Sequence, residues 1–186
     1  MLRAIYEQHK LPYIGMRYMN IYSPRMDYEG TYVSVIMKVL DKIFAKLTDY
    51  PEGFNPHPKL AKQFEGRAKT YHEEGEAEWA LGEAFAIGSL LLEGTSVRLA
   101  GEDSRRGTFS QRHAALIDYE NERNWVPLAD LPAENTNFWV YDSLLSEYAA
   151  LGFEYGYAHT NPSALVMWEA QFGDFVNGAQ IIIDQY

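Results

Sequence analysis

The sequence predicts an α/β protein in which a parallel sheet is flanked by helices. Stretches typical of strands alternate with helical stretches along the second half of the chain, which is the pattern of α/β units. The continuous apolar run "ALVMWEAQF" is typical of a strand covered on both faces. With 186 residues, the chain is long enough for one domain with its own core or for two small units.

The first part of the chain predicts a helix, a strand and a second helix. Residues 2–9 resemble the end of a helix, which Pro12 stops, and "YIGMRYMNIY" at 13–22 predicts a buried strand. Residues 31–47 predict an amphipathic helix, with an apolar stripe of Val35, Ile36, Val39, Leu40, Ile43 and Phe44. Three prolines within "TDYPEGFNPHPKL" then predict an irregular connector.

The rest of the chain predicts alternating helices and strands. Residues 59–78 are expected to be helical in part, and "WALGEAFAIGSLLLEG" predicts an apolar helix that Gly94 ends. Strands are expected at "TSVRLAGED", "FWVYDS" and "ALVMWEAQF", and helices at "SLLSEYAALGFEYGY" and "FVNGAQIIIDQY". No internal repeat interrupts this order.

Charge and composition exclude several classes of protein. The net charge is −10, and no cluster of Lys and Arg is interleaved with aromatic residues, which argues against a nucleic-acid or membrane partner. The absence of cysteine excludes disulfide scaffolds, thiolate metal sites and cysteine nucleophiles. No stretch reaches the ~18 apolar residues that span a bilayer, and the charged start does not resemble a signal peptide. We expect a cytoplasmic protein.

Common catalytic motifs are absent, and two features remain as candidates. The sequence contains no Walker A loop, GxGxxG, HExxH or GxSxG motif, and its five histidines lack metal-ligand spacing. The polar loop "GEDSRRGTF" follows a predicted strand, so it is expected where α/β proteins bind ligands. Glu147 lies in an apolar run, and on a helix it would have few polar neighbours. A carboxyl in that setting gains proton affinity and suits a weakly basic ring nitrogen; the alternative is a solvated helix residue.

From about Pro51 onward the chain resembles the decarboxylase component of the 2-oxoglutarate dehydrogenase complex, a thiamine-diphosphate enzyme. The resemblance rests on "PEGFNPHPKL", "GSLLLEGTSVRLAGEDSRRGTFSQRHA", "YDSLLSEYAALGFEYGYA" and "LVMWEAQFGDFVNGAQ", in that order. It implies a partial transketolase-like pyrimidine-binding domain over 75–186, preceded by a connector at 48–74. It also implies a 2-oxo acid substrate in the tricarboxylic acid cycle, a lipoyl-bearing succinyltransferase partner and a homodimer in the parent enzyme.

The resemblance assigns roles to individual residues. Glu147 of the "LSE" motif is expected to bind the N1′ nitrogen of the cofactor's aminopyrimidine, with Leu145 of the same motif nearby. Phe172 and Phe175 are candidates to stack on that ring, with Phe175 favoured, and Gln171 is expected to line the pocket. Glu102 stands where the family often carries a glutamine that faces the substrate-derived intermediate.

The resemblance also implies that half of the site lies elsewhere. The family's diphosphate and Mg²⁺ ligands follow a "GDG" motif in a separate domain, and this sequence contains no GDG. We therefore expect the Mg²⁺ ligands in a missing domain and no activity from this chain alone. The alternative functions are a non-catalytic module that pairs with an intact decarboxylase and a nucleotide-sugar epimerase fragment.

Residues 1–47 resemble a different family, the NAD-dependent sugar-nucleotide epimerases and dehydratases. The residues that fit that family's motif after its catalytic tyrosine and lysine are Arg17, Asn20, Tyr22, Pro24 and Arg25. Ser23 replaces the usual glycine. This resemblance implies a strand followed by a helix, in a fragment without hydride chemistry, joined to the decarboxylase-like part near residues 47–51.

Overall fold

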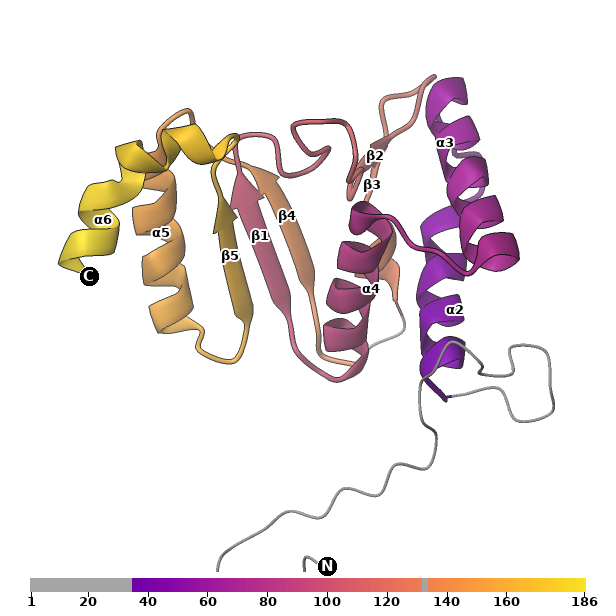
Figure 1. Ribbon diagram of the computed structural model, residues 1–186, viewed down its shortest axis with the longest axis horizontal. Coiled ribbons are helices and arrows are strands. Elements are labelled where there is room, and N and C mark those ends of the chain that lie inside the picture. Colours follow the sequence, from indigo (N-terminus) through magenta and orange to yellow (C-terminus); the bar gives the residue numbers. More distant parts are fainter. Residues whose placement is uncertain (1–34, 132–133) are drawn as a thin grey trace, which may run out of the picture. The chain divides into compact units, whose positions relative to one another are not determined.

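The computed structural model describes residues 35–131 and 134–186 (Figure 1). Of these, residues Val39–Tyr186 belong to one compact unit. The predictions for residues 1–34, including the strand at 13–22 and the epimerase-like motif from Arg17 to Arg25, lie outside the described residues.

A three-stranded parallel sheet forms the centre of this unit. Strand β1 (Val97–Gly101) lies between β4 (Phe138–Asp142) and β5 (Leu165–Glu169), and Leu99 is opposite Val140 and Met167. The predicted α/β class and parallel sheet are confirmed. The expectation that β5 is covered on both faces is wrong, because Leu165 is exposed and the other four residues of β5 are only half-buried. An apolar run indicates low polarity, but it does not show how far other elements cover each face of the strand.

Helices lie on two sides of the sheet (Figure 1). Arg98 and Trp139 point toward α5 (Glu147–Thr160), whereas Phe138, on the opposite face, lies with residues of α4 (Trp79–Leu92). Alternate residues of a strand point to opposite faces, so α4 and α5 cover different faces. The short helix α6 (Gln180–Gln185) follows the 3₁₀ turn η3 (Gly173–Ala179), and both contact α5.

The remaining elements precede β4. They are α2 (Val35–Thr48), α3 (Pro58–Lys69), the π-helical turn η1 (Thr70–Glu74), the antiparallel pair β2 (Leu116–Ile117) and β3 (Asn124–Trp125), and the 3₁₀ turn η2 (Pro127–Asp130). Ile43 and Phe44 of the predicted stripe are buried, but Val35 and Ile36 are 67% and 46% exposed. A Cβ on Gly88 of α4 would lie only 2.7 Å from Ile43 Cγ2, so α2 and α4 approach closely at this glycine.

The start of α5 differs from the sequence prediction. The Ser146 hydroxyl accepts a hydrogen bond from the Ala149 amide at 3.3 Å and caps the helix, which therefore begins at Glu147 instead of residue 143. Leu144 and Leu145 lie before the helix and are 76% and 89% exposed. The helix therefore does not include Leu144 and Leu145 of the predicted stretch.

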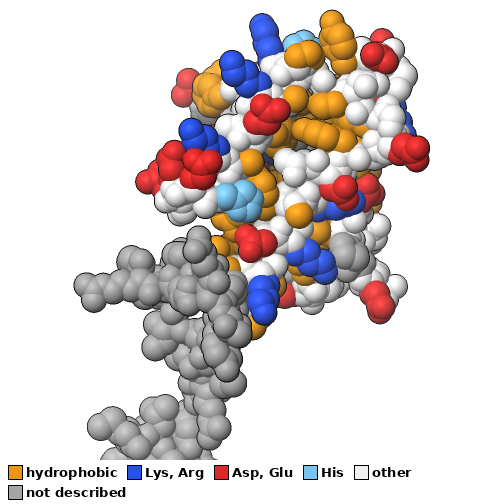
Figure 2. All heavy atoms as spheres, turned by 90° about the vertical axis from the view of Figure 1, so that its right-hand side faces the viewer, with side chains coloured by type: hydrophobic (Ala, Val, Ile, Leu, Met, Phe, Trp, Pro, Cys, Tyr) orange, Lys and Arg blue, Asp and Glu red, His pale blue; other side chains and the backbone are white. Residues whose placement is uncertain are grey.

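One face of the molecule carries charges of both signs. On the face shown in Figure 2, acidic, basic and apolar side chains lie next to one another, and apolar side chains gather in a hollow. None of the described helices is both long and apolar enough to cross a membrane.

Candidate active site

The carboxyl ends of the three strands bring the candidate residues to one edge of the sheet. Glu102 follows β1, Ser143 follows β4, and Gln171 lies two residues after β5. The Ser143 amide donates a hydrogen bond to the Gly101 carbonyl at 2.7 Å, which joins the first two of these ends. Because parallel strands end at the same edge, residues distant in sequence meet here.

Glu147 is the first residue of α5 and is half-buried. A Cβ added to Gly178 would lie 3.1 Å from Glu147 Oε2 and 3.5 Å from Glu147 Cβ, so the backbone of η3 passes directly beside this side chain. Glu147 begins the helix instead of lying inside it, and the acidic group of Glu102 is near it, so the expected setting inside an apolar helix is not found.

Glu102 and Glu147 form a carboxyl pair, although one follows β1 and the other begins α5. Burial raises the pKa of Glu102, and the nearby carboxyl of Glu147 raises it further. The loop glutamate and the helix glutamate of the sequence prediction therefore belong to one site.

Three phenylalanines form an aromatic row. The ring centroids of Phe109 and Phe172 are 5.9 Å apart, and those of Phe172 and Phe175 are 6.0 Å apart, both in edge-to-face geometry. Phe172 and Phe175 are 42% and 46% exposed, which leaves ring surface free for a ligand. Phe109 was not predicted; its position in the loop after β1 is the signal that could have identified it.

One short turn connects the aromatic row to the carboxyl pair. Phe175 and Gly178 are three residues apart in η3, and residues at that spacing lie on the same side of a 3₁₀ turn. Gly178 contacts Glu147, so Phe175 is placed one turn away from that contact. Gln171 is half-buried, and its carbonyl accepts a hydrogen bond from Thr108 Oγ1 at 3.0 Å. Leu145 points into solvent.

Arg112 holds the loop after β1 in place. Its guanidinium pairs with Glu83 of α4 and Glu169 of β5, with a 2.8 Å bond from Nη2 to Glu169 Oε2. It also donates to the Ser104 carbonyl at 3.0 Å, and Ser104 Oγ donates to Glu169 at 2.7 Å. Burial raises the pKa of Glu169, but the hydrogen bonds from Arg112 and Ser104 outweigh it and leave that pKa below its ordinary value.

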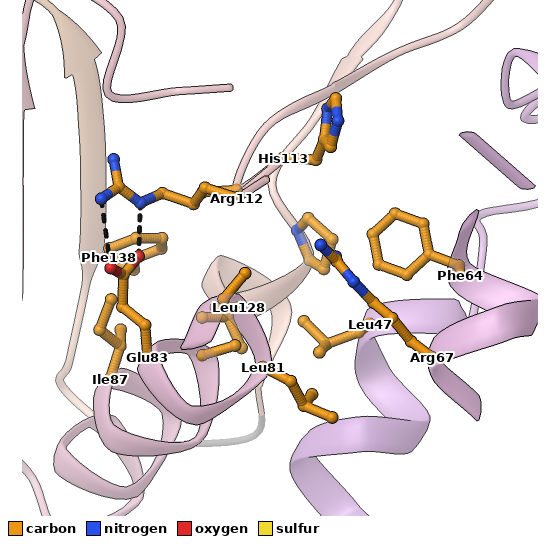
Figure 3. A pocket seen from close by; sticks show the side chains of 14 residues that line it. Leu47, Phe64, Arg67, Leu81, Glu83, Ile87, Arg112, His113, Leu128 and Phe138 are labelled. Atoms are coloured by element: carbon orange, nitrogen blue, oxygen red, sulfur yellow. Dashed lines mark hydrogen bonds and ion pairs between the residues drawn. The ribbon is translucent and has the colours of Figure 1, made fainter. Parts of the chain in front are cut away.

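A small cavity lies next to this loop, and none of the candidate residues lines it. The cavity has a volume of about 20 Å³ (Figure 3). Its apolar lining includes Leu81, Ile87, Leu128 and Phe138, and its polar side includes Arg112 and Arg67. That volume holds about one water molecule and excludes a cofactor. Among the described residues, no three acidic or histidine side chains are grouped so that they could hold a metal ion.

This fold and site define a class: a parallel α/β domain that carries an acid and aromatic rings at the carboxyl edge of its sheet. Residues 75–186 match the family described as the transketolase pyrimidine-binding domain. The chain belongs to this family.

Three curated relatives are similar to this chain over more residues than the family match covers. A 2-oxoglutarate dehydrogenase E1 component of Rickettsia conorii is 48% identical over 158 residues, covering 85% of this chain and 17% of the relative. The mitochondrial 2-oxoglutarate dehydrogenase of Saccharomyces cerevisiae is 50% identical over 150 residues, covering 81% and 14%. A multifunctional 2-oxoglutarate metabolism enzyme of Mycolicibacterium vanbaalenii is 44% identical over 173 residues, covering 90% and 14%. The chain thus spans 14–17% of these relatives, and its resemblance to the decarboxylase component is confirmed.

Proposed function

We propose that this chain is the pyrimidine-binding part of a thiamine-diphosphate-dependent 2-oxoglutarate decarboxylase. The parent reaction is the oxidative decarboxylation of 2-oxoglutarate with transfer of the succinyl group to a lipoyl carrier. The observation that carries the proposal is the position of Glu147 beside Gly178, one turn from Phe175, in a domain of the matched family.

The residues present suit an aminopyrimidine ring. Such a ring needs a carboxyl at its ring nitrogen and an apolar or aromatic surface along its face. Glu147 offers the carboxyl, half-buried next to a residue without a side chain. Phe172 and Phe175 offer partly exposed rings, and Gln171 is proposed to line the same pocket.

Each residue has a proposed role. Thiamine diphosphate, when bound, supplies the electron sink for the carbanion that decarboxylation leaves. Glu147 binds the ring nitrogen and exchanges a proton with it, and Phe175 orients the ring by stacking. Arg112 is a positioning residue, because its pairs with Glu83 and Glu169 fix the loop that carries Glu102.

The rest of the active site is proposed to lie outside this chain. The diphosphate and Mg²⁺ ligands, and the groups that bind the 2-oxo acid, would come from other domains of the parent enzyme and from the second subunit of a homodimer. The succinyltransferase component is the proposed acceptor partner. The chain alone is proposed to be inactive.

The decarboxylase-like part of the chain is proposed to start before residue 51. An alignment that covers 90% of 186 residues leaves about 19 uncovered, so it includes more than half of residues 1–47. The second half of α2 also belongs to the compact unit, where the Tyr71 hydroxyl donates to Asp41 Oδ1 at 2.9 Å. We therefore propose that any epimerase-like segment is confined to residues before α2, that a connector follows α2, and that the pyrimidine-binding domain occupies 75–186.

A second candidate function is a non-catalytic module that docks on an intact decarboxylase. The observation that favours it is the exposure of Leu144 and Leu145, which form an apolar pair beside the site. Co-purification with an intact decarboxylase, in the absence of any aminopyrimidine binding, would support this alternative.

The test of the main proposal uses the aminopyrimidine half of the cofactor. We expect 4-amino-5-hydroxymethyl-2-methylpyrimidine to bind the chain with a dissociation constant of about 1 mM, the level typical for a fragment of this size. Titration followed by NMR should show shifts at Glu147 and Phe175, and Glu147→Gln or Phe175→Ala should weaken binding about tenfold.

A control variant, Glu93→Gln, changes an exposed glutamate at the far end of α4 and should bind as the unmodified chain does. Equal binding by the Glu147→Gln variant would contradict the proposed role of Glu147. Release of CO₂ from 2-oxoglutarate by this chain with thiamine diphosphate and Mg²⁺ would contradict the proposed absence of half of the site.

A further inference from the structure

The loop between β1 and β2 holds an exposed aromatic residue on a backbone with its own hydrogen bonds. Phe109 is 76% exposed. Its amide donates a hydrogen bond to Gln111 Oε1 at 2.9 Å, and the Ser110 amide donates to the Gly107 carbonyl at 2.9 Å. Gly107 and Ser110 have φ angles of 83° and 54°, in the left-handed region that few side chains favour. These bonds and angles fix the direction of the Cα–Cβ bond of Phe109.

Two consecutive residues of this loop contact two consecutive residues after β5. Thr108 Oγ1 donates to the Gln171 carbonyl at 3.0 Å. The ring centroids of Phe109 and Phe172 are 5.9 Å apart, with an angle of 82° between the ring planes. The hydrogen bond fixes the backbone next to Phe172, and the edge-to-face contact restricts its ring. The loop therefore acts on both the position and the orientation of Phe172.

The contacts continue from Phe172 toward Glu147. The Phe172 carbonyl accepts the Phe175 amide at 3.0 Å at the start of η3, and the two ring centroids are 6.0 Å apart. Gly178 belongs to the same turn, and a Cβ added there would lie 3.1 Å from Glu147 Oε2. The loop after β1 is thereby connected through η3 to the candidate acid.

We propose that Phe109 and Thr108 are positioning residues, which hold Phe172 in the orientation that a bound ring meets. The identity of that ring as an aminopyrimidine rests on the proposed function. Phe172 stays 42% exposed between its two ring neighbours, so part of its surface remains available to a planar ligand. A side chain that is already held in place loses less conformational freedom on binding, which raises the affinity.

The first test measures binding of 4-amino-5-hydroxymethyl-2-methylpyrimidine by NMR titration. Phe109→Leu keeps an apolar side chain without the ring and should weaken binding about fivefold, the size of one aromatic contact. Phe109→Tyr keeps the ring and should bind within about twofold of the unmodified chain. Because the Phe109 ring is mostly exposed, both variants should unfold within about 3 °C of the unmodified chain.

Substitutions of Thr108 test the hydrogen bond separately. Thr108→Val removes the hydroxyl at nearly constant shape and should weaken binding about threefold, whereas Thr108→Ser keeps the donor and should bind within about twofold of the unmodified chain. The control is Tyr119→Leu, which removes another exposed ring, one whose centroid lies 5.1 Å from that of His57. This control should leave binding unchanged.

A measurement without ligand tests the positioning of Phe172 directly. The ring-proton signals of Phe172 should shift in Phe109→Leu, because the neighbouring aromatic ring that acts on them is removed. They should stay in place in Tyr119→Leu. If the Phe172 signals are the same in Phe109→Leu as in the unmodified chain, the positioning role is overturned.

The two measurements separate this proposal from the proposed function. If the unmodified chain binds the aminopyrimidine and Phe109→Leu binds it equally well, the positioning role is overturned and the proposed function stands. If the unmodified chain does not bind it, the proposed function fails, and the Phe172 signals alone decide whether Phe109 positions that ring.

Discussion

Arg98 and Glu154 form a bidentate ion pair that joins the central strand β1 to α5. Arg98 Nε and Nη2 donate to the two carboxylate oxygens of Glu154 at 2.6 and 2.8 Å. The guanidinium also lies over the rings of Tyr157, Tyr141 and Phe153, at 4.5, 4.8 and 5.4 Å from their centroids. Because Glu154 lies two turns after Glu147, this pair fixes the helix that carries the candidate acid.

Replacing Glu154 by glutamine should destabilise the fold strongly. The side chains of Arg98 and Glu154 are only 12% and 5% exposed, so the substitution leaves a buried guanidinium without its counter-charge. We expect a loss of about 3 kcal/mol in the free energy of unfolding, measured by urea denaturation. The surface pair Lys46–Asp49 provides the control: Asp49→Asn should cost less than about 0.5 kcal/mol. Equal effects of the two substitutions would contradict this account.

Gly101 should not tolerate a side chain. A Cβ there would lie 2.5 Å from the Glu169 carbonyl and 2.6 Å from Ser104 Oγ, so the backbone of β5 would have to move. We expect Gly101→Ala to lower the free energy of unfolding by about 2 kcal/mol.

Gly66 of α3 offers the matched comparison, because nothing lies within 4 Å of the corresponding Cβ. Alanine favours a helix over glycine, so Gly66→Ala should raise the free energy of unfolding by about 0.5 to 1 kcal/mol. If Gly101→Ala left the free energy of unfolding unchanged, the end of β1 would be less tightly packed than the structure indicates.

Low pH should weaken the interactions of Glu169 that join β5 to the loop after β1. The pKa of Glu169 is lowered from its ordinary value of about 4.5, so its contribution is present above that pH and is lost as pH falls through the folded-state value. Glu169→Gln should be less stable than the unmodified chain at pH 7 and should lose less stability between pH 5 and pH 3. Parallel stability curves, measured by urea denaturation across this range, would argue against the pair.

His113 should make the fold sensitive to pH in a different range. Burial lowers the pKa of His113 from about 6.5, with smaller contributions of the same sign from Arg67 and Arg106. Its neutral form therefore contributes stability above pH 6.5 that is lost as pH falls through the folded-state pKa. His113→Asn should remove this loss between pH 7 and pH 5, since asparagine tolerates the φ of 51° at this position. His159→Asn, an exposed change on α5, should leave the loss intact.

The sequence was sufficient to predict the parallel α/β class and most helices and strands of the described residues. Periodicity identified α4 and the three sheet strands because each has a continuous apolar pattern bounded by turn residues. It failed at the start of α5, where "SLLSEY" continues a helical pattern but Ser146 caps the helix through its side chain. It also failed for β5, since the covering of the two faces of a strand depends on elements distant in sequence.

The candidate site was only partly predictable. The resemblance indicated Glu147, Phe172 and Phe175, and the polar loop indicated Glu102, but no local pattern indicates that Glu102 and Glu147 lie near each other. That proximity depends on parallel strands ending at the same edge. Phe109 was missed for the same reason, because its partner Phe172 lies 63 residues later in the chain.

Several contacts of the fold depend on the central strand β1. Arg98 faces α5, Gly101 fits against β5, and Glu102 reaches the helix start, so three structural tasks depend on the register of five residues and the one that follows. Inserting or deleting one residue in β1 would turn every side chain to the opposite face and put Leu99 or Val97 opposite Glu154. Changes in the length of β1 should therefore be far less tolerated than most single substitutions within it.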